Sequence, residues 1–202
     1  MVEEAARRRS PHFGVIRIAL AACACMAVAD ARAQAYDVVG QCRSGVPNGA
    51  YELRMADGRL RVAGAFSQGR LTGTFIFWGA GGARVAVLPL DNDMRSGTIA
   101  LWYTAPDGRS EAGRRLEAPY VDNQPHGIKR SWYASGTLRA EARYDHGDLV
   151  EARAWREDGT PLSDAEARSV SARDEEDDER TVASLVALVR QHLPVCEPEA
   201  TG

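Results

Sequence analysis

The chain has 202 residues, of which 25 are basic and 28 acidic, which gives a formal net charge of −3. The imbalance lies at the C-terminal end: residues 34–162 carry 16 basic and 15 acidic side chains, whereas four basic and ten acidic side chains follow from Ser163 onward. Neither part has the clustered basic residues that a phosphate backbone requires, so the composition argues against nucleic-acid binding.

The first 33 residues have the three regions of a secretory signal peptide. A basic start is followed by a short apolar run over residues 18–29, and small residues at Ala31 and Ala33 precede an expected cut before Gln34. The apolar run is too short to cross a bilayer as a helix. We therefore expect a periplasmic or secreted protein, with cleavage after Ala35 as an alternative.

A lipoprotein signal is the other interpretation of the leader. Residues 20–23 have the form of a lipobox, in which Cys23 would be acylated and would hold the protein on a membrane. Only five apolar residues separate Arg17 from this cysteine, whereas apolar regions of signal peptides usually run to about seven to fifteen residues. Export as a soluble protein is the preferred prediction, and membrane attachment is expected only with lipidation at Cys23.

Removal of the leader would leave two cysteines, Cys42 and Cys196. In an oxidising compartment an isolated pair is more typical of a disulfide than of a metal site, which needs further ligands at close spacing. Such a bridge would contribute on the order of 4 to 5 kcal/mol in the chain-entropy treatment. Two unpaired thiols in flexible ends are the alternative, because sequence does not give the distance between the Cα atoms.

Five stretches of the chain share a pattern of glycines and aromatic residues. They open at Gly49, Gly73, Gly97, Gly127 and Val150, with spacings of 24, 24, 30 and 23 residues. A period of this size indicates a repeat array. Tryptophan falls five residues after the opening position in four of the five stretches, at Trp78, Trp102, Trp132 and Trp155.

Within each stretch the local pattern predicts a β-hairpin. Five glycine-containing pairs punctuate the apolar runs: Asp57-Gly58, Asp107-Gly108, Ser135-Gly136, His146-Gly147 and Asp158-Gly159. Glycine supplies the positive φ that tight turns need. Alternate residues of a strand point to opposite faces, so the stacked tryptophans are expected to form one row. We interpret this row as the core of the array, and a groove for a glycan or an extended peptide is the alternative.

The core pattern G-x-x-x-x-[WY]-[YW]-x-x-G, with an aromatic-x-x-Gly echo at Phe66–Gly69 and Tyr144–Gly147, resembles the MORN repeat. It is most similar to the bacterial variant found in antitoxin-like proteins of the YwqK type. The resemblance covers residues 49–162 and is closest in the fourth stretch, Gly127–Gly147. It implies a mainly β fold, an elongated single sheet of stacked hairpins, and a scaffold or interaction role more than any chemistry.

An acidic amphipathic helical segment is predicted over residues 163–193, between the repeats and a flexible tail of residues 194–202. Ser163 and Glu166 form a capping box. An apolar stripe follows at three- and four-residue intervals, and Pro194 ends the helix. The stripe consists of Val182, Leu185, Val186, Val189 and Leu193. We expect it to cap an end or cover a face of the sheet, with docking on another protein as the alternative.

The acidic run at residues 174–179 interrupts this segment. Its like charges are expected to repel, to remain solvated and to split the segment into two helices. The run lacks the ligand spacing and the glycine of an EF-hand loop, which argues against calcium binding.

Known catalytic motifs are absent from the sequence after residue 33. His126 and His146 are interpreted as turn residues, His192 as a helix-end residue, and Asp91–Asp93 as a turn between repeats. We therefore predict no enzyme, no cofactor and no metal. The leading hypothesis is a non-catalytic periplasmic scaffold that binds an unidentified protein partner.

Two further hypotheses come from different classes. One is an antitoxin-like protein that neutralises a partner toxin. The other is a cell-envelope module for lipid head groups or glycan, although the nearly neutral repeats offer little to anionic lipid. An edge strand at the first repeat leaves a homodimer open. Residues 34–48 are expected to form an N-terminal segment ahead of the repeats.

Overall fold

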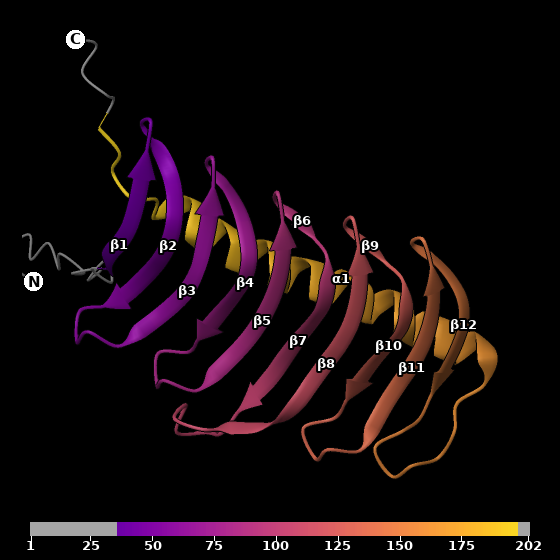
Figure 1. Cartoon of the computed structure of the whole chain (residues 1–202). Helices are drawn as coiled ribbons and strands as arrows, with labels where there is room; N and C mark the ends of the chain where they lie inside the picture. Colours follow the sequence, from indigo (N-terminus) through magenta and orange to yellow (C-terminus); the bar gives the residue numbers. More distant parts are fainter. Residues whose placement is uncertain (1–35, 198–202) are drawn as a thin grey trace, which may run out of the picture. The chain divides into compact units, whose positions relative to one another are not determined.

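The structure is a computed structural model that describes residues 36–197. The expected signal peptide, its cleavage point between Ala33 and Gln34, and Cys23 lie outside the described residues. The described part forms one open antiparallel sheet of twelve strands and a single helix (Figure 1). The predicted fold class, a sheet of stacked hairpins followed by a helical segment, is confirmed.

Ten strands follow one another across the sheet, and two short ones, β6 and β9, pair with β5 and β8. The strands are β1 (Tyr36–Arg43), β2 (Val46–Met55), β3 (Leu60–Ser67), β4 (Arg70–Trp78), β5 (Arg84–Asp91), β6 (Met94–Arg95), β7 (Gly97–Thr104), β8 (Glu111–Val121), β9 (Gln124–Pro125), β10 (Gly127–Trp132), β11 (Leu138–Asp145) and β12 (Asp148–Ala154). The sheet begins at Tyr36, so the segment expected to precede the repeats supplies its first strand.

Turns of two kinds alternate between the two ends of the strands. At one end, two residues with positive φ join the strands, as in Ser44-Gly45 and His146-Gly147. Positive φ at both positions is what the type I′ hairpin turn requires, and its twist matches that of the strands. At the other end the loops are longer and close on a glycine. In the loop between β2 and β3, for example, the backbone N–H of Arg59 donates to Asp57 Oδ1 at 3.0 Å.

The helix α1 (Asp164–Gln191) lies against one face of the sheet and runs from β12 back toward β1 (Figure 1). The predicted capping box starts it: Ser163 accepts from the backbone of Glu166, and the Glu166 side chain accepts from the backbone of Ser163. The expectation of two helices separated by a solvated acidic run is wrong. The helix is continuous through residues 174–179, and four of the six carboxylates in this run, Asp174, Glu175, Asp178 and Glu179, are paired with cationic side chains of the sheet.

The hydrophobic core lies between α1 and the face of the sheet that it covers. Val182, Leu185 and Val189 belong to a cluster with large residues of β2–β8, whereas Ala167 and Val170 pack on alanines of β11 and β12. One cross-strand row of this face shows the change in size: Leu53, Val62, Phe77, Ala86, Leu101, Leu116, Ser131, Ala140 and Ala154. The predicted apolar stripe from Val182 to Val189 therefore covers a face of the sheet, one of the two places that the sequence suggested, whereas Leu193 follows the helix and is exposed.

Gly64 gives a direct test of this packing. A Cβ atom at this position would overlap the ring of Phe75, which is fully buried in the core. We expect Gly64→Ala to lower the free energy of unfolding by about 1–3 kcal/mol, because overpacking forces the ring or the strand to shift. Urea denaturation measures the effect.

Gly79→Ala is the matched control for this substitution. Its Cβ would meet Val85 Cγ1 at 3.4 Å, an ordinary contact. We expect a change of less than about 0.5 kcal/mol, as for most surface substitutions. Equal losses in the two variants would contradict the placement of Phe75 beneath Gly64.

Candidate functional site

Cys42 in β1 and Cys196 after the helix lie at disulfide distance, with Cα atoms 5.6 Å apart. The segment around Cys196 also packs on the first hairpin. The Tyr51 hydroxyl donates to the His192 carbonyl at 2.8 Å, and the rings of Tyr36 and His192 meet edge to face. Burial raises the pKa of Tyr51 to about 12. The return of the chain to β1 therefore rests on several contacts besides the cysteines.

The four tryptophans do not form the buried core, contrary to the favoured interpretation. Each follows a residue that faces the helix and is at least nine-tenths buried: Phe77, Leu101, Ser131 and Ala154. The tryptophans themselves are half-buried. Because side chains alternate along a strand, these tryptophans lie on the face that the helix leaves open.

Tyrosines that follow two of the tryptophans link successive hairpins. The Tyr103 hydroxyl donates to the Trp132 carbonyl at 2.9 Å, and the Tyr133 hydroxyl donates to the Trp155 carbonyl at 2.8 Å. Each bond therefore joins one repeat to the backbone of the next. Tyr103 and Tyr133 of the repeated aromatic pair thus have a structural role. The tryptophan beside each of them lies on the open face.

The open face changes in character along the sheet. One cross-strand row contains Ala63, Ile76, Val87 and Ala100, and then Glu117, Arg130, Glu141 and Arg153. Most charged side chains in the second half of this row form ion pairs with other charged side chains nearby. For example, Arg130 Nε lies 2.8 Å from Glu141 Oε2. The row therefore changes along the sheet from aliphatic side chains to exposed ion pairs, which contribute little to stability.

A shallow hollow of about 450 Å³ lies at the loop end of this apolar half. Trp78 and Ile76 line it together with Arg84, Arg109 and other residues of the loops. Arg84 also stacks over the ring of Trp102, with its guanidinium carbon 4.1 Å from the ring centroid. The hollow therefore combines apolar walls with one guanidinium group, that of Arg84, which an aromatic neighbour holds in place.

The covered face contains a set of charges that sequence reasoning missed. Lys129 Nζ lies 2.6 Å from Glu175 Oε2 and 2.9 Å from Asp178 Oδ2, and the Lys129 side chain is only 5% exposed. Arg115 contacts Asp178 from β8 at 2.8 Å. Arg139 contacts Asp174 at 2.8 Å. These six residues, which we call the buried ion cluster, hold the middle of α1 against β8, β10 and β11.

The electrostatics of the buried ion cluster follow from its burial. Burial alone disfavours the charged ammonium of Lys129, but the carboxylates of Asp178 and Glu175 more than offset this and raise its pKa. Burial also raises the pKa of Asp178, against the opposing effects of Lys129 and Arg115. The lysine is therefore charged, and together with Arg115 it stabilises the charged form of Asp178.

The repeat pattern contained the signal for this cluster. Lys129 and Ser131 occupy the second and fourth positions after the opening glycine, where the second and third repeats have Phe75 with Phe77 and Ile99 with Leu101. The substitution of polar for apolar residues at two core positions coincides with the acidic run of the helix above them. Ser131 Oγ donates to Asp174 Oδ2 at 2.9 Å.

No protein-family model matches the chain, and no curated protein matches it. Among residues 36–197, none of the helical structure is both long enough and apolar enough to cross a membrane.

Proposed function

We propose that this protein is a non-catalytic, MORN-like scaffold of the periplasm that binds a protein partner through the open face of its sheet. The single observation that supports this best is the hollow between Trp78, Arg84 and Arg109. Tryptophan and arginine are the residues that most often dominate the energy of protein interfaces. The other face is covered by α1, which the buried ion cluster holds in place.

The chemistry of the hollow favours a particular kind of partner segment. Its walls at Ile76 and Trp78 would bury an apolar side chain. Arg84 shares its charge with Glu111, 3.0 Å away, whereas Arg109 is exposed at the rim. A partner loop with an apolar side chain beside a carboxylate complements both features.

Site-specific photocrosslinking in the native host tests this proposal. A photoreactive residue at Ser110, on the rim of the hollow, is expected to capture one protein in stoichiometric amount. The same residue at Ser184, exposed on α1, is the control and is expected to capture none. Arg109→Glu is expected to lower capture from Ser110 at least about tenfold, because an interface charge reversal costs more than about 1.4 kcal/mol.

Two results would contradict the proposal. Capture from Ser184 but not from Ser110 would move the contact to the helix. Capture from Ser110 that Arg109→Glu leaves unchanged would show that the crosslinked protein does not use the hollow. Because Arg109 is exposed in a loop, its substitution is expected to leave the melting temperature unchanged.

A further inference from the structure

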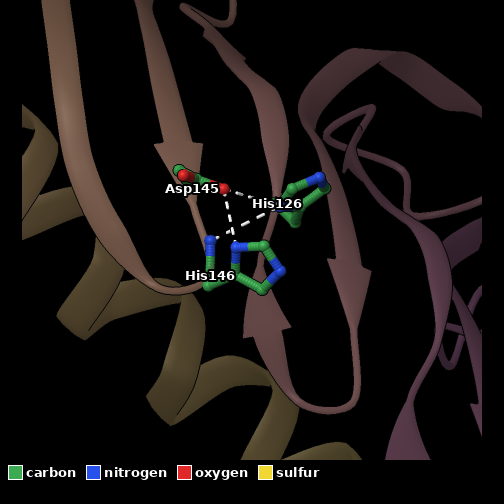
Figure 2. A group of neighbouring side chains, drawn as sticks. All are labelled: His126, Asp145 and His146. Atoms are coloured by element: carbon green, nitrogen blue, oxygen red, sulfur yellow. Dashed lines mark hydrogen bonds and ion pairs between the residues drawn. The ribbon is translucent and has the colours of Figure 1, made fainter.

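Two histidines and an aspartate gather at the two-residue-turn end of the sheet, away from the hollow. His126 precedes β10, Asp145 ends β11 and His146 is the first residue of the turn into β12. Figure 2 shows the three side chains directed toward one another from neighbouring strand ends. One ligand atom from each residue lies within 4.8 Å of the other two. The stacking of hairpins thus joins residues that the sequence separates by twenty positions.

The distances between these donors suit a small divalent ion. Asp145 Oδ1 lies 2.7 Å from His146 Nδ1 and 3.4 Å from His126 Nδ1. Ligands about 2.0–2.1 Å from a tetrahedral zinc ion lie roughly 3.3 Å from one another. Asp145 and His126 are therefore already at this spacing, Asp145 and His146 need to move apart by about 0.6 Å, and all three donors lie within 4.8 Å of one another.

The surroundings also favour a cation. Asp148 is the cross-strand partner of Asp145, so a second carboxylate belongs to the same turn. The side chains of His126, Asp145 and His146 are 43%, 65% and 72% exposed. An ion bound here would keep access to water for its remaining coordination position, as in open three-ligand zinc sites.

A purely structural role for His126 is the alternative explanation, and the repeat that opens at Gly49 allows the two to be compared. There Asn48 Oδ1 accepts from the backbone N–H of Gln68 at 3.0 Å. At the equivalent positions, His126 Nδ1 accepts from the backbone N–H of His146 at 3.4 Å, which is longer than ordinary hydrogen bonds of this type. Asparagine thus makes the better turn contact, and the turn itself does not explain a histidine pair.

We propose that His126, Asp145 and His146 form a binding site for Zn²⁺ and related borderline transition-metal ions. Two imidazoles and one carboxylate are a ligand set for such ions, whereas Ca²⁺ and Mg²⁺ prefer sites made of oxygen ligands. The site is independent of the proposed interaction through the open face. It lies at the opposite end of the strands from the hollow.

The test compares the full, untagged chain with the double variant His126→Asn/His146→Gln. This variant copies Asn48 and Gln68, the equivalent residues of the repeat that opens at Gly49, so it removes both imidazoles and keeps a turn contact that this sheet already contains. Free thiols are alkylated beforehand, and ZnCl₂ is titrated by isothermal calorimetry. We expect the wild type to bind one more equivalent of Zn²⁺ than the variant, with equal melting temperatures in the absence of metal.

Histidine ring signals in NMR spectra locate the ion. Addition of ZnCl₂ is expected to shift the signals of His126 and His146 and to leave those of His192 in place, and CaCl₂ is expected to shift none of them. Asp145→Asn is expected to weaken binding at least about tenfold. Equal zinc stoichiometry in wild type and double variant, or shifts confined to His192, would overturn the proposal.

Discussion

Replacement of Lys129 with methionine is expected to lower the free energy of unfolding by about 3–5 kcal/mol, because a buried ion pair that loses one partner leaves an uncompensated charge. The side chains of Lys129 and Asp178 are 5% and 8% exposed, so water can replace little of the lost contact. Methionine keeps most of the length of the side chain, and the loss therefore reports mainly the charge. Urea denaturation followed by tryptophan fluorescence measures it.

Arg143→Met is the matched control on the open face. Arg143 pairs with Glu151 at 2.7 Å, but its side chain is 58% exposed. Pairs of this kind contribute roughly 0–1 kcal/mol, so a small change is expected. If Lys129→Met cost no more than Arg143→Met, the helix would not be held by the buried ion cluster, and hydrophobic contacts alone would fix its position.

Loss of the link between Cys42 and Cys196 is expected to have an effect of similar size. The two residues are 154 positions apart, so a bond between them closes almost the whole described chain into one loop. In the chain-entropy treatment, closure of a loop this long stabilises the fold by about 5 kcal/mol. We expect the double variant Cys42→Ser/Cys196→Ser to unfold at a clearly lower urea concentration than the oxidised wild type.

Reduction provides the control for this comparison. A reducing agent is expected to move the wild-type transition to that of the double variant and to leave the variant itself unchanged. A difference below about 1 kcal/mol between oxidised and reduced wild type would contradict the expectation. It would mean that the contacts of Tyr36 and Tyr51 with His192 already hold the C-terminal segment in place.

Local signals predicted most of the fold. Glycine after aspartate or histidine predicted the turns, and Ser163 with Glu166 predicted the start of the helix; the structure confirms both. These features depend on residues within one or two turns of each other. Such interactions are encoded in short stretches and need no knowledge of the tertiary fold.

Local signals of this kind do not predict which face of the sheet carries the tryptophan row. Alternation along a strand shows that Trp102 points to one face of the sheet and that its neighbours Leu101 and Tyr103 point to the other. It does not show which of these faces the helix covers, and either choice buries aromatic residues. The helix packs on the face of Leu101, so the prediction that the tryptophans form the core is wrong.

The prediction that the acidic run is solvated and splits the helix is wrong for a related reason. Considered alone, residues 174–179 repel one another and favour solvent. Their partners Arg115, Lys129 and Arg139 come from three strands that only the folded sheet brings together. The histidine group has the same origin, since His126 and His146 meet across two stacked hairpins. Long-range pairings of this kind become visible when repeats are aligned and their unusual positions are compared.

The helix also limits how this sheet can change in evolution. At 1.5 Å per residue, the 28 residues of α1 are about 42 Å long. Ten successive strands about 4.8 Å apart span about 43 Å, so the two lengths agree. Duplication of one hairpin would widen the sheet by roughly 10 Å and would require about six more helical residues. Unlike an open array, in which copies are gained and lost freely, this protein can change its repeat number only together with the length of its helix.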